Sequence, residues 1–173
     1  IDSVDDYVRE YVDDGGFEGD HNGAITWRHL LDQTSEWEGT LFGKPDAVDR
    51  NRAVGKDGEA LDKSETRSLR EPGTFWEYND VRINRLSLAL LRTIGRPLPR
   101  VLAEHVMGPV GATDTWEWHG YHNSTVDVDG TAMAGVSGGG HWGGGLWISA
   151  RDLARVGLLY LNGGEWDGRR VTG

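Results

Sequence analysis

Apolar residues recur at helical spacing in several parts of the chain and alternate with polar residues in others. Apolar side chains three or four positions apart share one face of a helix, whereas in a strand every second side chain does. This spacing predicts helices over residues 4–13, 26–34, 81–94, 99–107 and 150–162. Alternation and turn signals predict short strands within residues 116–136, 145–149 and 165–171. Residues 35–72 show no period, which predicts a long polar loop.

The segment over residues 81–94 is the clearest of the predicted helices. Its apolar stripe is formed by Ile83, Leu86, Leu90 and Ile94 and is widened by Leu88 and Leu91. Apolar groups on most faces indicate a buried helix. Gly95 and Pro97 follow the last apolar residue, an order that is typical of helix ends.

The two later helices carry start signals and apolar faces of their own. Ser149 precedes Asp152 by three positions, the spacing of a capping box, and so marks the start of the last helix. Asp167-Gly168 favours a two-residue hairpin turn after it. The side chains expected to face inward are Val101, Leu102, His105 and Val106 in the first, and Leu153, Val156 and Tyr160 in the second.

Composition excludes several classes of function. The 173 residues suffice for one domain or part of a larger one. A formal net charge of −10 repels phosphate backbones and anionic membranes, so neither nucleic acid nor a membrane surface is an expected partner. No run approaches the roughly 20 apolar residues of a membrane span. The absence of Cys excludes disulfide scaffolds, cysteine nucleophiles and Cys-bound zinc.

Several common catalytic motifs are also absent, namely the Gly-x-Ser-x-Gly elbow, the phosphate-binding loop and the His-Glu-x-x-His helix. His119 and His122 lie near Asp127 and Asp129, which leaves a weak metal cluster as one interpretation. On a strand, an offset of three places the two histidines on opposite faces. The favoured interpretation is therefore exposed loop residues.

Tyr78 stands out by its context, just after Pro72-Gly73 and directly before the buried helix. The positive end of a helix favours negative charge and can stabilise a phenolate, which is a usable general base. The alternative is a structural Tyr in the core whose hydroxyl forms a hydrogen bond. Side-chain chemistry alone favours that alternative.

Residues 137–145 form a glycine-rich segment that contains His141 and Trp142. Glycine allows a backbone to approach a ligand or another strand closely, so the two side chains could line a pocket. A tight structural crossover with Trp142 as a packing residue fits the same pattern. The local sequence does not separate the two interpretations.

Four segments of the chain are distinctive: ITWRHLLDQTSEW (25–37), PGTFWEYND (72–80), GPVGATDTWEW (108–118) and the segment over residues 143–164. In this order they resemble the motifs hxhRHLLxHTSGh, PGxxFxYSN, xPLGMxDTxW and GGGLxSTARDLARFGLLLLNGG of the serine β-lactamase-related family of hydrolases. That family contains class C β-lactamases, D-Ala-D-Ala peptidases, esterases and 6-aminohexanoate-dimer hydrolases. The Trp-rich segments are most similar to the esterase and 6-aminohexanoate-dimer hydrolase branch.

The resemblance implies an α+β fold of the β-lactamase/transpeptidase-like class. Residues 1–173 would be one partial domain, the mostly helical central part of that fold without most of its antiparallel sheet. It also implies a serine hydrolase that cleaves an amide or ester bond in a small-molecule amide, ester or lactam through an acyl-serine. No metal or organic cofactor is implied.

The resemblance assigns roles to individual residues of this chain. Tyr78 matches the family's Tyr, which shuttles the proton during catalysis. Asp80 matches a position near the substrate at which Asn is usual, and Asp adds a charge and lacks the amide donor. Gly144 matches a segment that lines the substrate cleft, and His141 and Trp142 would lie at its rim and contact the substrate.

Neither the family's Ser-x-x-Lys motif nor its Lys- or His-Thr-Gly motif occurs in residues 1–173. We therefore expect an internal fragment, inactive alone, whose nucleophile lies outside this chain. The alternatives are a non-catalytic penicillin-recognising-like binding module and a helical domain without a site. Convergence of Tyr78 with residues 138–145 in space would favour catalysis over the last of these.

Overall fold

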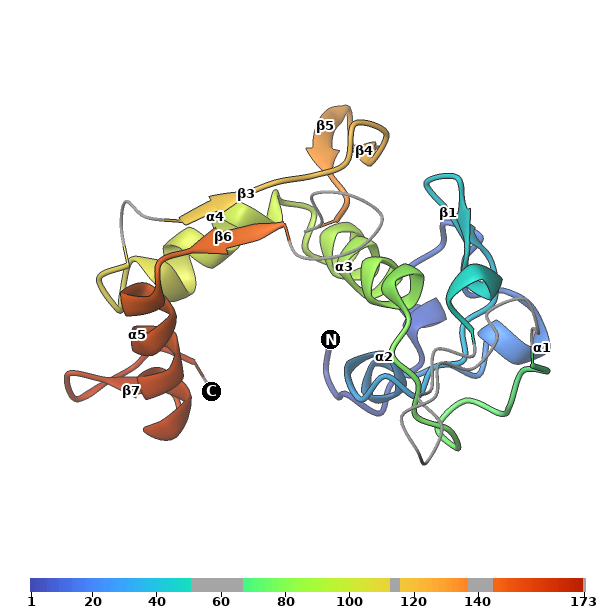
Figure 1. The fold of residues 1–173 in the computed structure, drawn as a ribbon, viewed down its shortest axis with the longest axis horizontal. Helices are drawn as coiled ribbons and strands as arrows, with labels where there is room; N and C mark the ends of the chain where they lie inside the picture. Colours follow the sequence, from blue (N-terminus) through green and yellow to red (C-terminus); the bar gives the residue numbers. More distant parts are fainter. Residues whose placement is uncertain (51–66, 113–115, 137–144, 173) are drawn as a thin grey trace, which may run out of the picture. The chain divides into compact units, whose positions relative to one another are not determined.

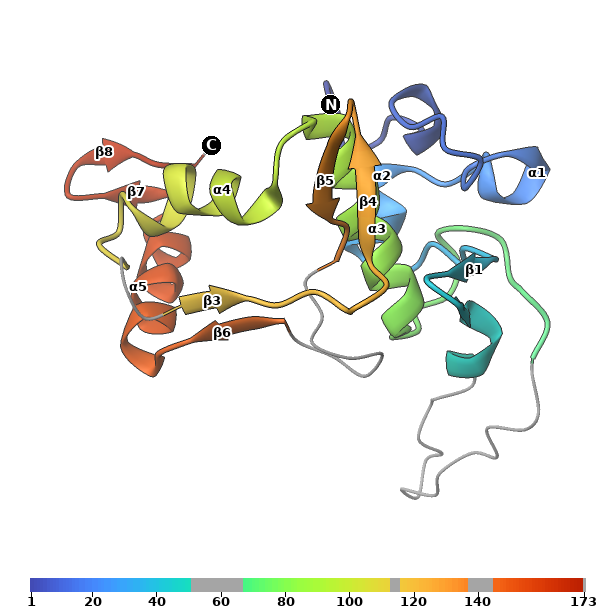
Figure 2. The same ribbon diagram turned by 90° about the horizontal axis from the view of Figure 1, so that it is seen from above.

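The computed structural model describes residues 1–50, 67–112, 116–136 and 145–172. The chain divides into two compact units, Ile1–Ile94 and Gly95–Gly173. Figures 1 and 2 show the ribbon of both units from two directions. Each unit has its own helices and short strands.

The first unit is built around one long helix, α3 (Asp80–Ile94), which confirms the helix predicted over residues 81–94. It contacts the shorter α2 (Trp27–Leu31) and the strand β1 (Thr40–Leu41). The remaining elements are the 3-10 turns η1 (Val8–Glu10) and η2 (Asp46–Asp49), the helix α1 (Gly19–Asn22) and the strand β2 (Lys44–Pro45). The unit's buried apolar side chains include Val8, Val12, Phe17, Ile25, Trp27, Leu30, Trp37, Leu88 and Leu91.

The prediction of a helix over residues 4–13 is wrong, since only the single turn η1 forms there. The hydrogen bonds within this segment form turns only, and other backbone groups of the segment bond to the chain around the start of α2. Trp27 N–H donates to the Asp6 carbonyl at 3.2 Å. Val8 N–H donates to the Ile25 carbonyl at 3.0 Å. Pairing with a distant segment has overridden a local spacing that suited a helix.

The prediction of a long polar loop over residues 35–72 is wrong for its first part. The antiparallel hairpin β1–β2 and the turn η2 form within it. Asp46 and Asp49 of η2 are buried, so charged side chains occupy interior positions that a search for apolar periodicity does not detect. Residues 51–66 of the predicted loop lie outside the described residues.

Asn79 provides the start signal of α3. Its Oδ1 accepts hydrogen bonds from the backbone N–H groups of Val81 at 3.0 Å and Arg82 at 3.3 Å. An Asn in this position satisfies N–H groups that have no partner within the helix, a contribution of typically about 1 kcal/mol.

The most buried face of α3 contains Leu88 and Leu91, the two residues predicted to widen the apolar stripe, but not the four residues of the stripe itself. Three residues of that stripe, Ile83, Leu86 and Leu90, are only partly buried, and the fourth, Ile94, is exposed. The buried residues of the helix are Asp80, Val81, Arg82, Arg85, Leu88, Ala89 and Leu91. The two buried arginines, Arg82 and Arg85, can face the interior because carboxylates pair with them, which offsets the cost of burying a charge.

The second unit combines two helices with three short strand pairs. The pairs are antiparallel, and Figures 1 and 2 show β3 and β6 side by side. Its elements are α4 (Leu98–Leu102), the π-helical turn η3 (Ala103–Met107), β3 (Trp116–Trp118), β4 (Thr125–Val128), β5 (Thr131–Ala134), β6 (Leu146–Ile148), α5 (Ala150–Leu161), β7 (Glu165–Trp166) and β8 (Arg169–Arg170). The predicted strands and the hairpin turn at Asp167-Gly168 are confirmed.

The core of this unit lies where η3, α5 and the strands meet. Its buried members are Met107, Val110, Ala112 and Leu159, with Leu102, Val106, Trp116, Leu146, Ile148, Val156, Trp166 and Val171 packed against them. The inward positions predicted for Leu102, Val106 and Val156 are confirmed. The inward position predicted for His105 is wrong, because the helix continues as a π-helical turn that rotates side chains away from α-helical spacing.

Helix α5 buries one side and exposes an apolar surface on the other. Ser149 caps it as predicted, accepting a hydrogen bond from the Asp152 N–H at 3.1 Å. Leu153 and Tyr160, predicted to face inward, are 56% and 79% exposed, because the buried side runs through Asp152 and Leu159 instead. The exposed surface, named here the outer face of α5, consists of Ala150, Leu153, Ala154, Gly157, Leu158, Tyr160 and Leu161. Among the described helices, none is both long and apolar enough for a membrane span.

Candidate functional site

Tyr78 lies in the segment that leads into α3, between two buried residues. Burial alternates from Phe75 to Asn79, as it does along an extended segment. Glu77 and Asn79 are 4% and 1% exposed, whereas Tyr78 is 39% exposed. At this exposure Tyr78 is not a core side chain.

Backbone hydrogen bonds hold this segment against the residues that follow α2. Gly73 N–H donates to the Thr34 carbonyl at 2.8 Å, and Glu77 N–H donates to the Gln33 carbonyl at 3.2 Å. Gly73 has a φ of +86°, and a Cβ atom there would lie 2.7 Å from His29 Nε2. Glycine is therefore required at this turn, which starts the approach to Tyr78.

Asp80, the second predicted site residue in this segment, is buried in the first turn of α3. Lys44 Nζ lies 3.8 Å from its Oδ2 and 2.7 Å from Asp49 Oδ2. The Asp80 carboxylate is thus matched by a cation of the same unit. A substrate-binding role for Asp80 remains a prediction.

A group of buried ion pairs lies behind Tyr78, and we name its members, Glu36, Asp46, Arg67, Glu77 and Arg82, the Glu36 cluster. Arg67 Nη2 lies 2.6 Å from Glu36 Oε1 and 2.5 Å from Glu77 Oε2. Arg82 Nη1 lies 2.6 Å from Glu36 Oε1, and its Nη2 lies 3.3 Å from Asp46 Oδ2. The cluster joins the start of α3 to residues 36–46 and to the residue preceding Tyr78.

Glu36 is the most completely enclosed member of the cluster, with no exposed surface. Burial by itself would raise the pKa of its carboxyl. The hydrogen bonds from Arg67 and the Arg70 N–H, together with the charge of Arg82, outweigh burial and lower this pKa to about 2. Glu36 therefore stays ionised in the folded chain far below its ordinary range.

This shift predicts a loss of stability in acid. The pKa of Glu36 is lower in the folded chain, about 2, than its ordinary value of 4.5, so its contribution is complete above pH 4.5 and is lost as the pH falls towards 2. The contribution is on the order of 3 kcal/mol. Urea unfolding across this pH range should show a steep fall for the natural sequence and a shallower one for Glu36→Gln. Equal slopes for the two proteins would contradict the prediction.

Three other predicted site residues, His141, Trp142 and Gly144, lie outside the described residues. Their approach to Tyr78 and their contact with a substrate remain predictions.

The metal cluster considered from the sequence does not form. Asp127 Oδ1 accepts a hydrogen bond from Gly130 N–H at 3.0 Å, and Asp129 occupies the turn between β4 and β5 with a φ of 52°. His119 Nε2 lies 3.1 Å from Glu117 Oε2. Within residues 1–50, 67–112, 116–136 and 145–172, no three acidic, His or Cys side chains gather in a way that could hold a metal ion.

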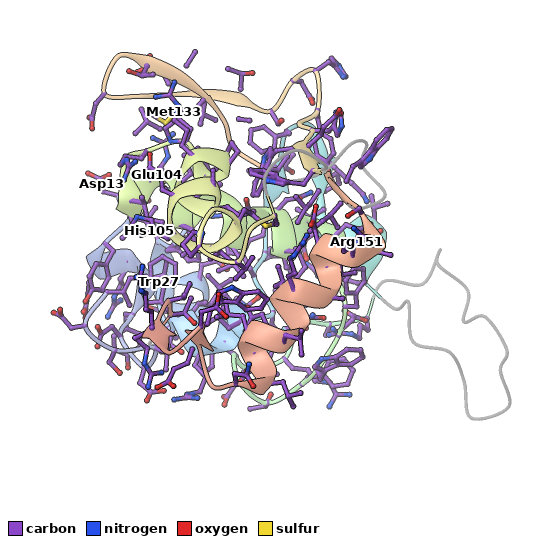
Figure 3. All side chains as sticks on the ribbon, turned by 90° about the vertical axis from the view of Figure 1, so that its left-hand side faces the viewer. Asp13, Trp27, Glu104, His105, Met133 and Arg151 are labelled. Atoms are coloured by element: carbon purple, nitrogen blue, oxygen red, sulfur yellow. The ribbon has the colours of Figure 1, made fainter. Side chains whose placement is uncertain are left out.

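One open pocket of about 600 Å³ lies in the second unit. Glu104 and His105, which Figure 3 labels on the helical segment, line it together with Trp166 and Arg169 of the terminal hairpin. Neither Tyr78 nor Asp80 belongs to its lining. The pocket therefore gives no support to the predicted site.

The sequence interpretation missed the Glu36 cluster entirely. Its members carry no apolar period, and they come from segments that are distant along the chain. One signal could have revealed it: charged residues are frequent around Tyr78, although the helix that follows was predicted to be buried. Charges at the start of a buried helix need partners of opposite charge.

The chain is similar to known proteins both in sequence and in fold. A family model described as Beta-lactamase matches residues 2–171. The fold is similar to a "putative beta-lactamase" from Bacteroides dorei DSM 17855, with a TM-score of 0.61 and 22% identity over 98% of this chain and 45% of that chain. It is also similar to a "putative 6-aminohexanoate-dimer hydrolase" from Bacillus anthracis, with a TM-score of 0.58 and 22% identity over 99% of this chain and 44% of that chain.

The chain thus spans less than half the length of either solved protein. At this identity the likeness concerns the fold, and it confirms the expected β-lactamase/transpeptidase-like class. No curated protein sequence matched the chain.

Proposed function

The chain belongs to the β-lactamase family, and from this premise we propose that the full-length protein is a serine hydrolase that cleaves an amide or ester bond of a small molecule. Residues 1–173 would supply the mostly helical part of the domain and the proton-transferring Tyr78. The nucleophilic Ser, its Lys partner and most of the antiparallel sheet would come from chain outside these residues.

The observation that carries the proposal is the placement of Tyr78. Its phenol is exposed between two buried neighbours, in the segment that resembles the family's Tyr motif, directly before α3. The positive end of a helix favours negative charge, which assists a phenolate at this position.

In the proposed reaction, Tyr78 takes the proton of the Ser hydroxyl as the Ser oxygen bonds to the substrate carbonyl carbon. The proton then passes to the leaving amine or alcohol as its bond to that carbon breaks, which leaves an acyl-serine. Water hydrolyses this ester in a second step, and the Ser recovers its proton. Covalent catalysis of this kind replaces one difficult step by two easier ones.

The test is to treat the full-length protein with a chromogenic cephalosporin and with p-nitrophenyl esters, and to record both turnover and protein mass. We expect turnover of at least one class and an acyl adduct on the Ser of a Ser-x-x-Lys motif. Residues 1–173 alone should show neither, because they contain no such motif.

A non-catalytic binding module is the second candidate. Trp76, two positions before Tyr78, is 65% exposed, and an exposed Trp beside an exposed Tyr suits recognition of a small ligand. Saturable binding of the same compounds without turnover or adduct would favour this candidate over hydrolysis.

A further inference from the structure

Arg67 joins two buried carboxylates by its guanidinium group. Its Nη1 and Nη2 donate to the two oxygens of Glu36 at 2.7 and 2.6 Å. Its Nη2 and Nε also donate to the two oxygens of Glu77 at 2.5 and 3.4 Å. A guanidinium can make this paired contact to two carboxylates because its donors lie in one rigid plane, which a lysine ammonium cannot reproduce.

Glu77 directly precedes Tyr78 in the chain, so the contact between Arg67 and Glu77 restrains the backbone next to Tyr78. On one side of Tyr78, the Glu77 side chain is held by Arg67 and its N–H by the Gln33 carbonyl. On the other side, Asn79 caps α3 and donates to the Asp46 carbonyl at 3.0 Å. The peptide that carries Tyr78 is therefore fixed at both ends, while Tyr78 itself is 39% exposed.

Glu36, the anchor of Arg67, occupies a backbone conformation that favours glycine. Its φ is 50°, and the family segment that residues 25–37 resemble has Gly at this position. A non-glycine residue in the left-handed region is strained, and such strain persists where surrounding contacts compensate for it. Here the compensation comes from Arg67, Arg82 and the Arg70 N–H, which donates to Glu36 at 2.9 Å.

We propose that Arg67 is a positioning residue for Tyr78, acting by joining the carboxylates of Glu36 and Glu77 behind it. The inference rests on the proposed function, because a fixed position of Tyr78 matters for catalysis only if Tyr78 transfers the proton. Displacement of a reacting group by about 1 Å can cost about 100-fold in rate, so a rigid support behind the phenol has a direct kinetic value.

The test combines enzyme kinetics with ¹⁹F NMR of the full-length protein labelled with 3-fluorotyrosine, in which Tyr78→Phe identifies the Tyr78 signal. In Arg67→Met, we expect the Tyr78 signal to shift or broaden and kcat to fall about 10- to 100-fold, with little change in KM. Arg67→Lys should restore only part of kcat. Glu77→Gln, which keeps the Arg67–Glu36 pair, is a milder second variant with the same expected direction in case Arg67→Met does not fold.

Arg70→Met is the matched control. Arg70 and Arg67 both lie over the Phe75 ring, at 4.6 and 4.3 Å, but the Arg70 side chain is exposed and it is its backbone that contacts Glu36. Its removal should leave both the NMR signal and kcat unchanged.

The outcomes separate this inference from the proposed function. An unchanged Tyr78 signal in folded Arg67→Met and Glu77→Gln, or a changed signal with unchanged kcat, would overturn the positioning role. Normal turnover in Tyr78→Phe would overturn the proposed function, and the NMR result would still report whether Arg67 holds the ring.

Discussion

Replacing Tyr78 with Phe in the full-length protein is expected to abolish measurable turnover, with kcat falling by about 10²- to 10⁴-fold. The substitution removes only the phenolic oxygen, which the proposed reaction uses to take the proton of the nucleophile. The ring remains, and the contacts that fix Glu77 and Asn79 on either side involve neither the ring nor its hydroxyl. Initial rates with the best ester or lactam substrate measure the effect, and the urea midpoint checks that the fold is retained.

Tyr7→Phe is the control for this prediction. Tyr7 is 41% exposed, close to the 39% of Tyr78, and the substitution is chemically identical. Tyr7 precedes the turn η1, far along the chain from the segment that resembles the family's Tyr motif. Its variant should keep normal kcat. A folded Tyr78→Phe protein with kcat close to that of the natural sequence contradicts the assignment of Tyr78.

The largest expected effect on stability belongs to Arg82. Arg82→Met should lower the free energy of unfolding by about 3 kcal/mol, because three buried carboxylates, those of Glu36, Asp46 and Glu77, lose a cation. The buried Trp37 carbonyl also loses the Arg82 Nε–H that donates to it at 3.1 Å. Urea unfolding followed by tryptophan fluorescence measures the change.

Arg28→Met is the matched control, since Arg28 also makes a short ion pair, 2.5 Å from Asp5 Oδ1. The two side chains of that pair are 51% and 66% exposed, and solvent screens such pairs. The urea midpoint should therefore barely move. Equal shifts in Arg28→Met and Arg82→Met would show that burial does not make the Glu36 cluster important for stability.

Local signals predicted the long elements well. The apolar content of residues 81–94 predicted helix α3. The spacing of Ser149 and Asp152 predicted the start of α5, and the hydrogen bond between these two residues is present. The helix over residues 4–13 failed although its spacing was equally regular. The Asp6 carbonyl accepts a hydrogen bond from Trp27 N–H, and Val8 N–H donates to the Ile25 carbonyl. A pattern in one segment carries no information about a partner elsewhere in the chain.

In the candidate site too, the local part could be predicted from the sequence and the part built from distant segments could not. Tyr78 could be identified because its motif is contiguous in sequence. The Glu36 cluster could not, because Arg67 and Arg82 reach Glu36 from 31 and 46 positions away. Buried charges also reverse the usual rule that charged side chains face solvent. Arg82 and Arg85 share the buried side of α3 with Leu88 and Leu91, and the apolar pattern could identify only the two leucines.

The outer face of α5 bears on how the protein can be produced and divided. A helix with apolar side chains around most of its circumference is suited to contact on both sides. In α5, Leu159 is buried in the core of the second unit, while Leu153, Tyr160 and Leu161 face solvent. A shortened protein that leaves the outer face of α5 exposed is expected to be less soluble than a longer one that covers it. If the expressed segment ends too close to α5, we expect the protein to aggregate before it loses helix content.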